Sequence, residues 1–503
     1  MSVQESIQRI LAVTPMCVGI GEPVVLKVKI CGDIKIIDNL SNYCSTTPRL
    51  KTWSNKAPRG SHFLDDTIDG WSGTLDLDTN GALEGPTSIT FDGIHQGTFP
   101  GDQRAIRVFD GWHWTRPGIH HIRLTDRESG FTAISNPIIV TETIPENRAY
   151  FGDIHWQTYF TDGLRNPEEL YYYAKDEGFL DFGAITDHSE GITDRQWDYM
   201  CAVTEDFNIP GEFSTLIGEE WTSFAPSHCG HRNIYYRDGQ RRPIYRSTDE
   251  HYDDIDKLYD TLKEEEAMAI PHHSSNIIMG VNWDAGHDPR LEPAVEIYSC
   301  WGSSELSKED GNIAPLLAEG GTTPGQYIRD ALRRGRRFGF VGGGDIHCGR
   351  PGDSFNQTCW TKKDGSGTEF HHQYVAGFTC ASLPQNTREN IYDAIQNRAT
   401  WVTTQQRYYL EYTIDGCNMG SQIVNGTGIH QLHILCVSNE DIVDCRLLSA
   451  YGEVAVFHPD PANPLILRID TDLSLEKGVY YPRITTVGGN MAWASPIWIA
   501  KED

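Results

Sequence analysis

Histidine and carboxylate side chains follow short apolar segments repeatedly in the middle of this 503-residue chain. Segment 182–185 leads to His188, for example, and segment 267–270 leads to His272. The residues placed in this way are Asp153, His155, Asp187, His188, Glu219, Glu220, His272, His273, Asp345 and His347. Neutral imidazole and carboxylate are the usual protein ligands of Zn²⁺, Mn²⁺ and Fe²⁺. The pattern therefore predicts a metal site.

The number of these side chains bears on the number of metal ions. A single tetrahedral site needs only four ligands. Seven of these residues, contributed by five or six strand ends, would be enough to hold two or three ions, provided that a carboxylate such as Glu220 bridges two of the ions. Each histidine alone has an ordinary explanation as a satisfied core residue, but the repetition favours ligation. We expect two or three divalent ions as cofactors, with zinc, manganese and iron all left open.

The elements that must bring these residues together are predicted from helix and strand signals. Asn166 can cap a helix that has Pro167 at its first position. Segments 253–266 and 323–334 are further predicted helices, and each leads into an apolar strand. Alternating helices and strands over about 250 residues predict a parallel sheet, most simply an α/β barrel. The ligands would then meet at the C-terminal ends of the strands.

Both ends of the chain show strand signals and little helical periodicity. Segments 118–126 and 131–140 are typical of a terminal hairpin of a β-sandwich, and segments 477–484 and 492–499 echo them. Two similar β modules or convergent hairpin composition would both explain this echo. The expected domains are a β-sandwich-like module over 1–147, a metal-binding barrel over 148–405 and a β-rich module over 406–503.

The composition restricts the partners and the compartment. Acidic residues outnumber basic ones by 70 to 42, and a formal net charge of −28 repels nucleic acid and anionic membranes. No apolar segment is long enough to span a bilayer, and segment 1–15 lacks the pattern of a secretory signal. The 12 cysteines form no CxxC pair, as in a reduced cytoplasmic protein. We expect a cytoplasmic protein with a small-molecule substrate and no nucleic-acid or membrane partner; whether it forms a homo-oligomer stays open.

Residues 150–404 resemble the PHP superfamily (polymerase and histidinol phosphatase), especially its DUF3604 subfamily. The matching motifs occur in family order: FGDIHWQTYFTDG, FGAITDHSE, GEEWTS, GHRNIYY, AIPHHSS, VEIYSCWG and FGFVGGGDIHCGRPG. A further segment, AIQNRATWVTT at 394–404, resembles an element typical of that subfamily. The resemblance implies a distorted (β/α)₇ barrel with a trinuclear metal site.

Carried over motif by motif, the resemblance implies ligands for each metal position. The first ion would be held by His155, Glu220 and Asp345, the second by Glu220, His231 and His272, and the third by His188 and His347. Family members often have asparagine at the position of His273. We therefore expect His273 to contact substrate rather than metal.

The first motif departs from the family pattern. It is normally His-x-His, whereas this chain has His155 followed by Trp156 and Gln157. A glutamine oxygen is a weaker, neutral donor, so the adjacent ion would be labile, absent or differently held. Gln157 stays a candidate ligand. Asp162 is an alternative ligand, although a loop cap explains it as well.

The predicted chemistry is metal-assisted hydrolysis, in which bound water ionises near neutral pH. His273 or Asp187 would move protons, and Arg350 or Arg232 would bind a substrate anion. Phosphoester hydrolysis leads because the resemblance points to it, whereas the residues alone fit amide or lactone hydrolysis equally well. A degenerate, non-catalytic metal-binding protein, marked by Gln157, is a further alternative.

Overall fold

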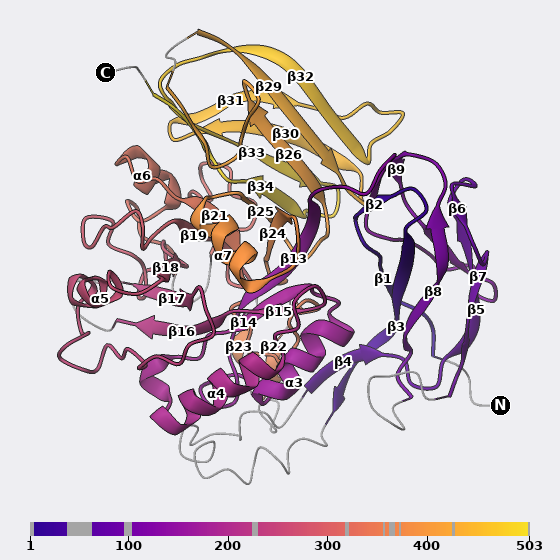
Figure 1. Ribbon diagram of the computed structural model, residues 1–503, viewed down its shortest axis with the longest axis horizontal. Coiled ribbons are helices and arrows are strands. Elements are labelled where there is room, and N and C mark those ends of the chain that lie inside the picture. The colour runs from indigo at the N-terminus through magenta and orange to yellow at the C-terminus, as the bar shows by residue number, and fades with distance from the viewer. Residues whose placement is uncertain are drawn as a thin grey trace.

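The chain forms three groups of elements in the computed structural model (Figure 1). The structure describes residues 5–37, 63–94, 103–223, 230–316, 321–355, 358–361, 368–371, 374–424 and 428–500. The N-terminal strands lie at the right of the view, the central strands and the helices at the left and below, and the C-terminal strands at the top.

The N-terminal strands form three antiparallel or mixed sheets around a core of their own. Alternate residues of β1 are buried, as expected where one face of a strand packs on a core. Leu26, Val28 and Ile30 of β3 and Trp114 of β8 contribute to that core. The strands are β1 (Arg9–Val13), β2 (Cys17–Gly19), β3 (Pro23–Ile37), β4 (Phe63–Thr67), β5 (Ser72–Asp78), β6 (Leu83–Glu84), β7 (Ser88–Asp92), β8 (Ile106–Trp114), β9 (Gly118–His120), β10 (Arg123–Asp126), β11 (Thr132–Ile134) and β12 (Ile138–Thr141).

The central region carries the helices and the strands that surround the candidate site. Its helices are α3 (Pro167–Tyr172), α4 (Asp194–Asp206), α5 (Ile255–Leu262), α6 (Ile328–Arg333) and α7 (Arg388–Gln396). Its strands are β13 (Arg148–Trp156), β14 (Phe182–Ile185), β15 (Ser214–Thr215), β16 (Ile217–Thr222), β17 (His231–Tyr236), β18 (Ala267–His272), β19 (Ala294–Ser299), β20 (Gly302–Ser303), β21 (Gly339–Gly342), β22 (Thr358–Thr361), β23 (Thr368–His371), β24 (Phe378–Leu383) and β25 (Thr400–Thr403).

The predicted fold class, a distorted (β/α)₇ barrel flanked by β-sandwich-like modules, is wrong. Among the described residues strands predominate, and the central strands are divided among separate sheets that do not close into a barrel. β17 lies between β16 and β18 and pairs antiparallel with both, whereas successive βα units would give parallel neighbours. The helix α6 has only six residues, and α3, also of six residues, continues directly into a π-helix over Tyr173–Glu177.

The local predictions in this region fared better. Asn166 caps α3, because its side chain accepts a hydrogen bond from the Glu169 backbone N–H at 2.8 Å, and Pro167 opens the helix as expected. The predicted strand at 182–185 coincides with β14. The segment at 267–270 belongs to β18, which continues to His272. Apolar runs and caps are local signals, whereas the pairing of strands depends on contacts between distant segments.

The C-terminal strands continue the central sheet. One sheet of eleven strands has the order β15-β14-β13-β24-β25-β34-β33-β30-β31 along its main path. In addition, β35 pairs with β33, and β28 pairs with β35. The C-terminal strands are β26 (Tyr409–Ile414), β27 (Cys417–Asn418), β28 (Gln422–Ile423), β29 (Gly428–Val437), β30 (Ile442–Ser449), β31 (Gly452–Phe457), β32 (Ile466–Leu475), β33 (Gly478–Thr486), β34 (Met491–Ala494) and β35 (Ile497–Ile499). The strands β13 and β14, which lead to His155 and His188, therefore share a sheet with the C-terminal strands.

The echo between the two ends of the sequence is also an echo in strand pairing. Near the N-terminus, β9 pairs antiparallel with β12, and β12 pairs parallel with β2. Near the C-terminus, β33 pairs antiparallel with β35, and β35 pairs parallel with β28. Each end also contains a further antiparallel pair, which is β10 with β11 near the N-terminus and β33 with β34 near the C-terminus. The two segments thus share a pairing pattern as well as a composition.

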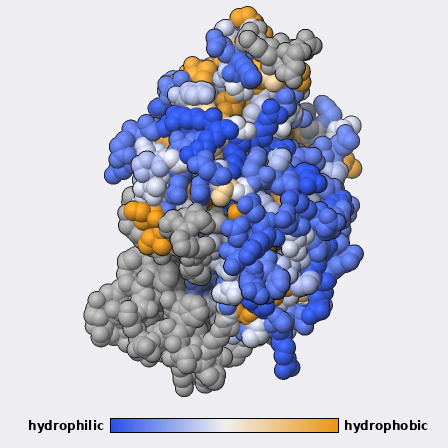
Figure 2. Space-filling model, turned by 90° about the vertical axis from the view of Figure 1, so that its left-hand side faces the viewer, coloured by the Kyte–Doolittle hydropathy of each residue, from blue (hydrophilic) through white to orange (hydrophobic). Residues whose placement is uncertain are grey.

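The face shown in Figure 2 is predominantly hydrophilic, in keeping with the excess of acidic residues. Within the described part of the chain, no helix has the length and apolar character needed to cross a bilayer.

Candidate metal centre

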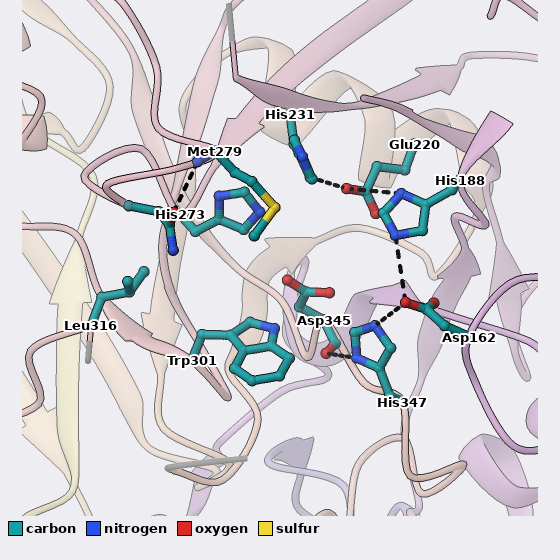
Figure 3. Close-up of a pocket in the computed structure, with 11 residues that line it drawn as sticks. Asp162, His188, Glu220, His231, His273, Met279, Trp301, Leu316, Asp345 and His347 are labelled. Atoms are coloured by element: carbon teal, nitrogen blue, oxygen red, sulfur yellow. Dashed lines mark hydrogen bonds and ion pairs between the residues drawn. The ribbon is translucent and has the colours of Figure 1, made fainter. Parts of the chain in front are cut away.

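The histidines and carboxylates meet around one cavity of about 120 Å³ (Figure 3). Strand pairing explains how they come together. His231 opens β17 and lies directly opposite His272, the last residue of β18. His188 forms an isolated parallel bridge with Glu220 of β16, and Trp156 of β13 forms one with Ile346. The cavity is lined by Asp162, His188, Glu220, His231, His273, Asn276, Met279, Trp301, Leu316, Asp345 and His347.

The first donor group is centred on Glu220. Its Oε1 lies 2.7 Å from His231 Nδ1 and 3.0 Å from His272 Nε2, and the three side chains are buried. His273 also belongs to this group: the centroid of its ring lies 4.6 Å from the ring centroid of His231 and 4.4 Å from the ring centroid of His272. One ligand atom from each of the four residues lies within 4.8 Å of the others.

The second donor group consists of His155, His272 and Asp345. His155 Nε2 lies 3.4 Å from Asp345 Oδ1 and 3.4 Å from Glu220 Oε2, so Glu220 stands between the first two groups. The other imidazole nitrogen of His155, Nδ1, lies 3.0 Å from Glu296 Oε2 on β19. A carboxylate behind a ligating histidine fixes its ring orientation. Glu296 has this position.

The third donor group is Asp162, His188 and His347. Asp162 Oδ2 lies 3.3 Å from His347 Nε2 and 3.8 Å from His188 Nε2. His188 Nδ1 is 3.5 Å from Glu220 Oε1 and 2.9 Å from Thr222 Oγ1. Asp162 therefore stands where a ligand would be needed beside His188 and His347.

Two cavity residues have strained backbones. His273 has φ of 30° and Asp345 has φ of 47°, in the left-handed region that non-glycine residues rarely adopt. Gly343, two residues before Asp345, allows a close approach, because a Cβ there would come within 2.1 Å of Glu296 Oε2 and 2.8 Å of His155 Cβ. Strain of this kind persists where the surrounding structure imposes it, and it gathers at functional sites.

The histidines that line the cavity fall into two electrostatic classes, with a raised or a lowered pKa. Burial, followed by the neighbouring His272 and His231, holds the pKa of His273 well below its ordinary value, and burial also lowers the pKa of His231. Burial opposes ionisation of His347 too, but the Asp162 carboxylate outweighs it and raises the pKa of His347 to about 9. A lowered pKa favours the neutral imidazole of His231 and His273, which is the form that ligates metals or accepts protons.

The donor set fits divalent cations. Ligands about 2.1 Å from one tetrahedral ion lie roughly 3.4 Å apart, as His155 Nε2 does from both Glu220 and Asp345. Among the described residues, His231 Nε2, His272 Nδ1 and His273 Nδ1 are buried without a hydrogen-bond partner. Buried polar atoms are normally partnered, so such a group needs an explanation. Imidazole and carboxylate suit zinc, manganese and iron.

Gln157 lies beside Glu220, but both ends of its amide are engaged. Its Nε2 donates to Glu220 Oε2 at 2.6 Å, and its Oε1 accepts from Thr161 Oγ1 at 3.0 Å. Thr161 also contacts Asp187, which accepts from the backbone N–H of Thr158 at 3.0 Å. Burial raises the pKa of Asp187 to about 6. Asp187 is not among the residues lining the cavity; its side chain contacts Thr158 and Thr161, and its backbone carbonyl accepts from the Glu220 N–H at 3.0 Å.

The two arginines expected to bind a substrate anion point elsewhere. Arg232 is buried with Glu292, with 3.1 Å between Nη2 and Oε1, and its Nε donates to Tyr259. Arg350 is fully buried, and its Nη2 lies 2.8 Å from Asp66 and 2.9 Å from Asp353. Neither arginine lines the cavity. The proposed role of Arg350 in catalysis is therefore corrected: it is an ion-pair partner in the protein interior.

Arg350 belongs to a larger set, which we call the buried ion-pair network. Asp353 Oδ2 lies 2.8 Å from Lys29 Nζ, and Asp353 Oδ1 lies 2.6 Å from Arg9 Nη1. The members of the network are Lys29, Asp65, Asp66, Arg350 and Asp353, which have little exposure, and Arg9, whose side chain is 38% exposed. It joins β1, β3 and β4 of the N-terminal region to the segment that follows His347.

Sequence reasoning did not single out Glu296, although its segment VEIYS was assigned to a strand. A lone carboxylate within an otherwise buried strand was the available signal, since burying a charge without a partner is costly. His155, His188, Glu220, His231, His272, Asp345 and His347 come together as expected, and so does Asp162. Whether any of them binds a metal stays a prediction.

The family model described as "Protein of unknown function (DUF3604)" matches residues 168–412. That segment includes most of the cavity, while His155 and Asp162 precede it. The wider assignment to the PHP superfamily stays a prediction. An uncharacterized protein of Chlamydia trachomatis serovar D is 26% identical over 413 residues, and one of Chlamydia pneumoniae is 27% identical over 411 residues. Each match covers 78% of this chain but only 64% of the relative, less than two thirds of its length.

Solved structures give a weaker similarity. The FMN-binding beta-glucuronidase from Facaelibacterium prausnitzii L2-6 aligns at 8% identity over 98% of this chain and 74% of its own, with a TM-score of 0.18. A putative beta-galactosidase from Bacteroides fragilis aligns with the same coverage and identity and a TM-score of 0.19. Scores of this size do not establish a shared fold.

Proposed function

We propose that this protein is a metal-dependent hydrolase, and specifically a phosphoesterase that acts on a small molecule. The observation that carries the proposal is the meeting of three buried groups of imidazole and carboxylate donors around one cavity. Sites with two or more neighbouring cations are typical of enzymes that displace a leaving group at phosphorus. The order of the sequence motifs, which resembles that of the PHP superfamily, supports the same chemistry.

The chain's own residues would divide the work by position. Glu220 would bridge two cations, because its Oε1 faces His231 and His272 while its Oε2 faces His155. Asp162, with His188 and His347, would hold a third. Cations bound there would supply a lowered pKa for water, to about 7, and would stabilise negative charge on the scissile phosphoryl group.

His273 is the residue best placed to move a proton. It lines the cavity, its pKa is held well below the ordinary value by burial and by two neighbouring histidines, and its Nδ1 has no hydrogen-bond partner among the described residues. A neutral imidazole can accept a proton from an attacking water and return it to the leaving group. Asp187 would instead position Gln157 through Thr161.

Elemental analysis coupled to a substrate panel tests this function. Protein grown with added zinc, manganese and iron and purified without chelator should contain two or three of these ions per chain. It should hydrolyse phosphomonoesters or phosphodiesters faster than amides and lactones. Amide or lactone turnover alone would replace the phosphoesterase with an amidohydrolase-like enzyme. Bound metal without turnover on any of them would identify a non-catalytic metal-binding protein, and absence of metal would exclude the metal-dependent reading.

A further inference from the structure

The cavity has two chemically different walls (Figure 3). Most of the histidines and carboxylates form one side, whereas Met279, Trp301 and Leu316 line the other side together with His273. Asn276, whose side chain accepts from the Met279 backbone N–H at 2.9 Å, also lines the cavity. Trp301 also packs edge-to-face against His347, with ring centroids 5.7 Å apart. Trp301 therefore lies directly beside a proposed metal ligand. We call Met279, Trp301 and Leu316 the apolar wall.

Among the described residues that line the cavity, none is lysine or arginine. The two arginines that the sequence suggested for anion binding, Arg232 and Arg350, are buried in ion pairs with Glu292, Asp66 and Asp353. A second phosphate or a carboxylate distant from the reacting group would meet the apolar wall, where burying a charge without a partner is unfavourable. Negative charge on a substrate would thus be tolerated only where it faces cations held by the imidazole and carboxylate donors.

The size of the cavity sets a further limit. Its volume is about 120 Å³, and an apolar cavity of roughly 150 Å³ holds one benzene molecule. The whole cavity is thus no larger than one that holds a single ring, which favours a compact group beside the apolar wall.

We propose that the substrate is a small ester with one anionic group, whose remaining part is compact and apolar and packs against Trp301, Met279 and Leu316. Sugar phosphates, nucleotides and bisphosphates would be poor ligands, because their polar or charged remainder would face that wall. This inference rests on the proposed function for the identity of the reacting group, but it concerns the recognition of the rest of the molecule.

A binding experiment tests the recognition without requiring turnover. Phenylphosphonate and methylphosphonate carry the same anionic group and differ in the apolar part, and neither is an ester. Calorimetric titration of the metal-loaded protein should give a Kd for phenylphosphonate at least about tenfold lower than for methylphosphonate, because the ring leaves water for an apolar surface. Equal affinities would overturn the inference.

Substitutions in the apolar wall locate the preference. Met279→Ala, at a partly exposed position, and Leu316→Ala should each reduce the ratio of the two affinities severalfold while leaving the affinity for methylphosphonate and the metal content unchanged. Ile429→Ala, at a 70% exposed position on β29, is the matched control and should not alter the ratio. A ratio that stays constant in both wall variants would show that the phenyl group binds elsewhere and would overturn the proposal.

Turnover of the metal-loaded parent protein then separates this inference from the proposed function. Phenyl phosphate should be hydrolysed with kcat/KM at least about tenfold higher than glucose 6-phosphate or a nucleoside monophosphate. Hydrolysis without this preference would contradict the inference and leave the phosphoesterase standing. Preferential binding of phenylphosphonate without any hydrolysis would contradict the phosphoesterase and leave the recognition of a compact apolar group standing.

Discussion

Two clusters of largely buried charged or ionisable side chains draw residues from the segment 345–353, and they are built in opposite ways. In the buried ion-pair network, the carboxylates of Asp65, Asp66 and Asp353 face the cations of Arg9, Lys29 and Arg350 at distances of 2.6 to 3.3 Å. In the metal-ligand cluster, by contrast, imidazoles crowd against a few carboxylates, and three ring nitrogens have no hydrogen-bond partner among the described residues.

The difference shows how a structural cluster can be told from a functional one. Donors and acceptors balance in the network, so its charges compensate each other inside the protein. In the metal-ligand cluster, the imidazole nitrogens and carboxylate oxygens carry more lone pairs than there are N–H or O–H groups to donate to them. Only a cation or added protons can satisfy these lone pairs. The network should therefore contribute to folding, whereas the metal-ligand cluster should contribute to metal binding and activity. Four predictions test this contrast.

The largest effect on folding is expected from Asp353→Ala. The substitution leaves Arg9, Lys29 and Arg350 without their shared carboxylate, and removing one partner of a buried ion pair costs about 3 to 5 kcal/mol. Urea denaturation should show this loss in the free energy of unfolding, while the folded fraction keeps its metal. Asp76→Ala is the control, since its ion pair with Arg127 is exposed to solvent and should matter little. Loss of metal with unchanged stability would reverse the roles of the two clusters.

The next effect concerns activity rather than folding. Glu220→Gln should lose metal and lower kcat at least about 100-fold, roughly 2.7 kcal/mol, because a neutral amide cannot bridge two cations as a carboxylate does. Glu219→Gln is a matched control one residue away. Glu219 is bound by the hydroxyl of Tyr236 at 2.9 Å and the backbone N–H of Tyr245 at 3.1 Å, outside the donor groups. If Glu220→Gln retains both its metal content and its full rate, the bridging role is misassigned.

The network should also give stability its own dependence on pH. Burial would raise the pKa of Asp65, but Lys29, Arg350 and hydrogen bonds from Thr67 outweigh it and hold the pKa at about 2. A lowered pKa in the folded state stabilises the protein above the ordinary value near 4, by about 2 kcal/mol, and this contribution is lost as the pH falls toward 2. The difference in unfolding free energy between the parent and Asp65→Asn should thus be constant from pH 7 to 5 and shrink below pH 4. A constant difference down to pH 3 would contradict the assignment.

The smallest effect is expected at Gln157. Replacing it with histidine should restore an imidazole beside Glu220 and raise resistance of the adjacent ion to chelator about tenfold, roughly 1.4 kcal/mol. Gln157→Ala should lower that resistance, since it removes the hydrogen bond to Glu220 Oε2. Metal content is measured for both variants beside the parent during dialysis against a chelator. Equal stoichiometry and equal rates of loss in all three proteins would exclude Gln157 as a ligand.

The sequence alone determined which residues are candidates and which short segments are strands. β14 coincides with the apolar run that predicts it, and Asn166 with Pro167 marks the start of α3, because these signals act between near neighbours. The histidines and carboxylates that follow such runs were identified for the same reason. The repeated pairing pattern of the two ends, visible in β9 with β12 and β33 with β35, also left a trace in the sequence.

Only the tertiary structure decided how those segments pair and which charges meet. The sequence favoured a closed parallel barrel, whereas β17 pairs antiparallel with its neighbours, because strand order depends on contacts between residues far apart in the chain. Arg350 follows His347 closely in sequence, yet its guanidinium turns away from the cavity to Asp66, 284 residues distant. A charged side chain takes its role from the partner that compensates it, and that partner is set by the fold.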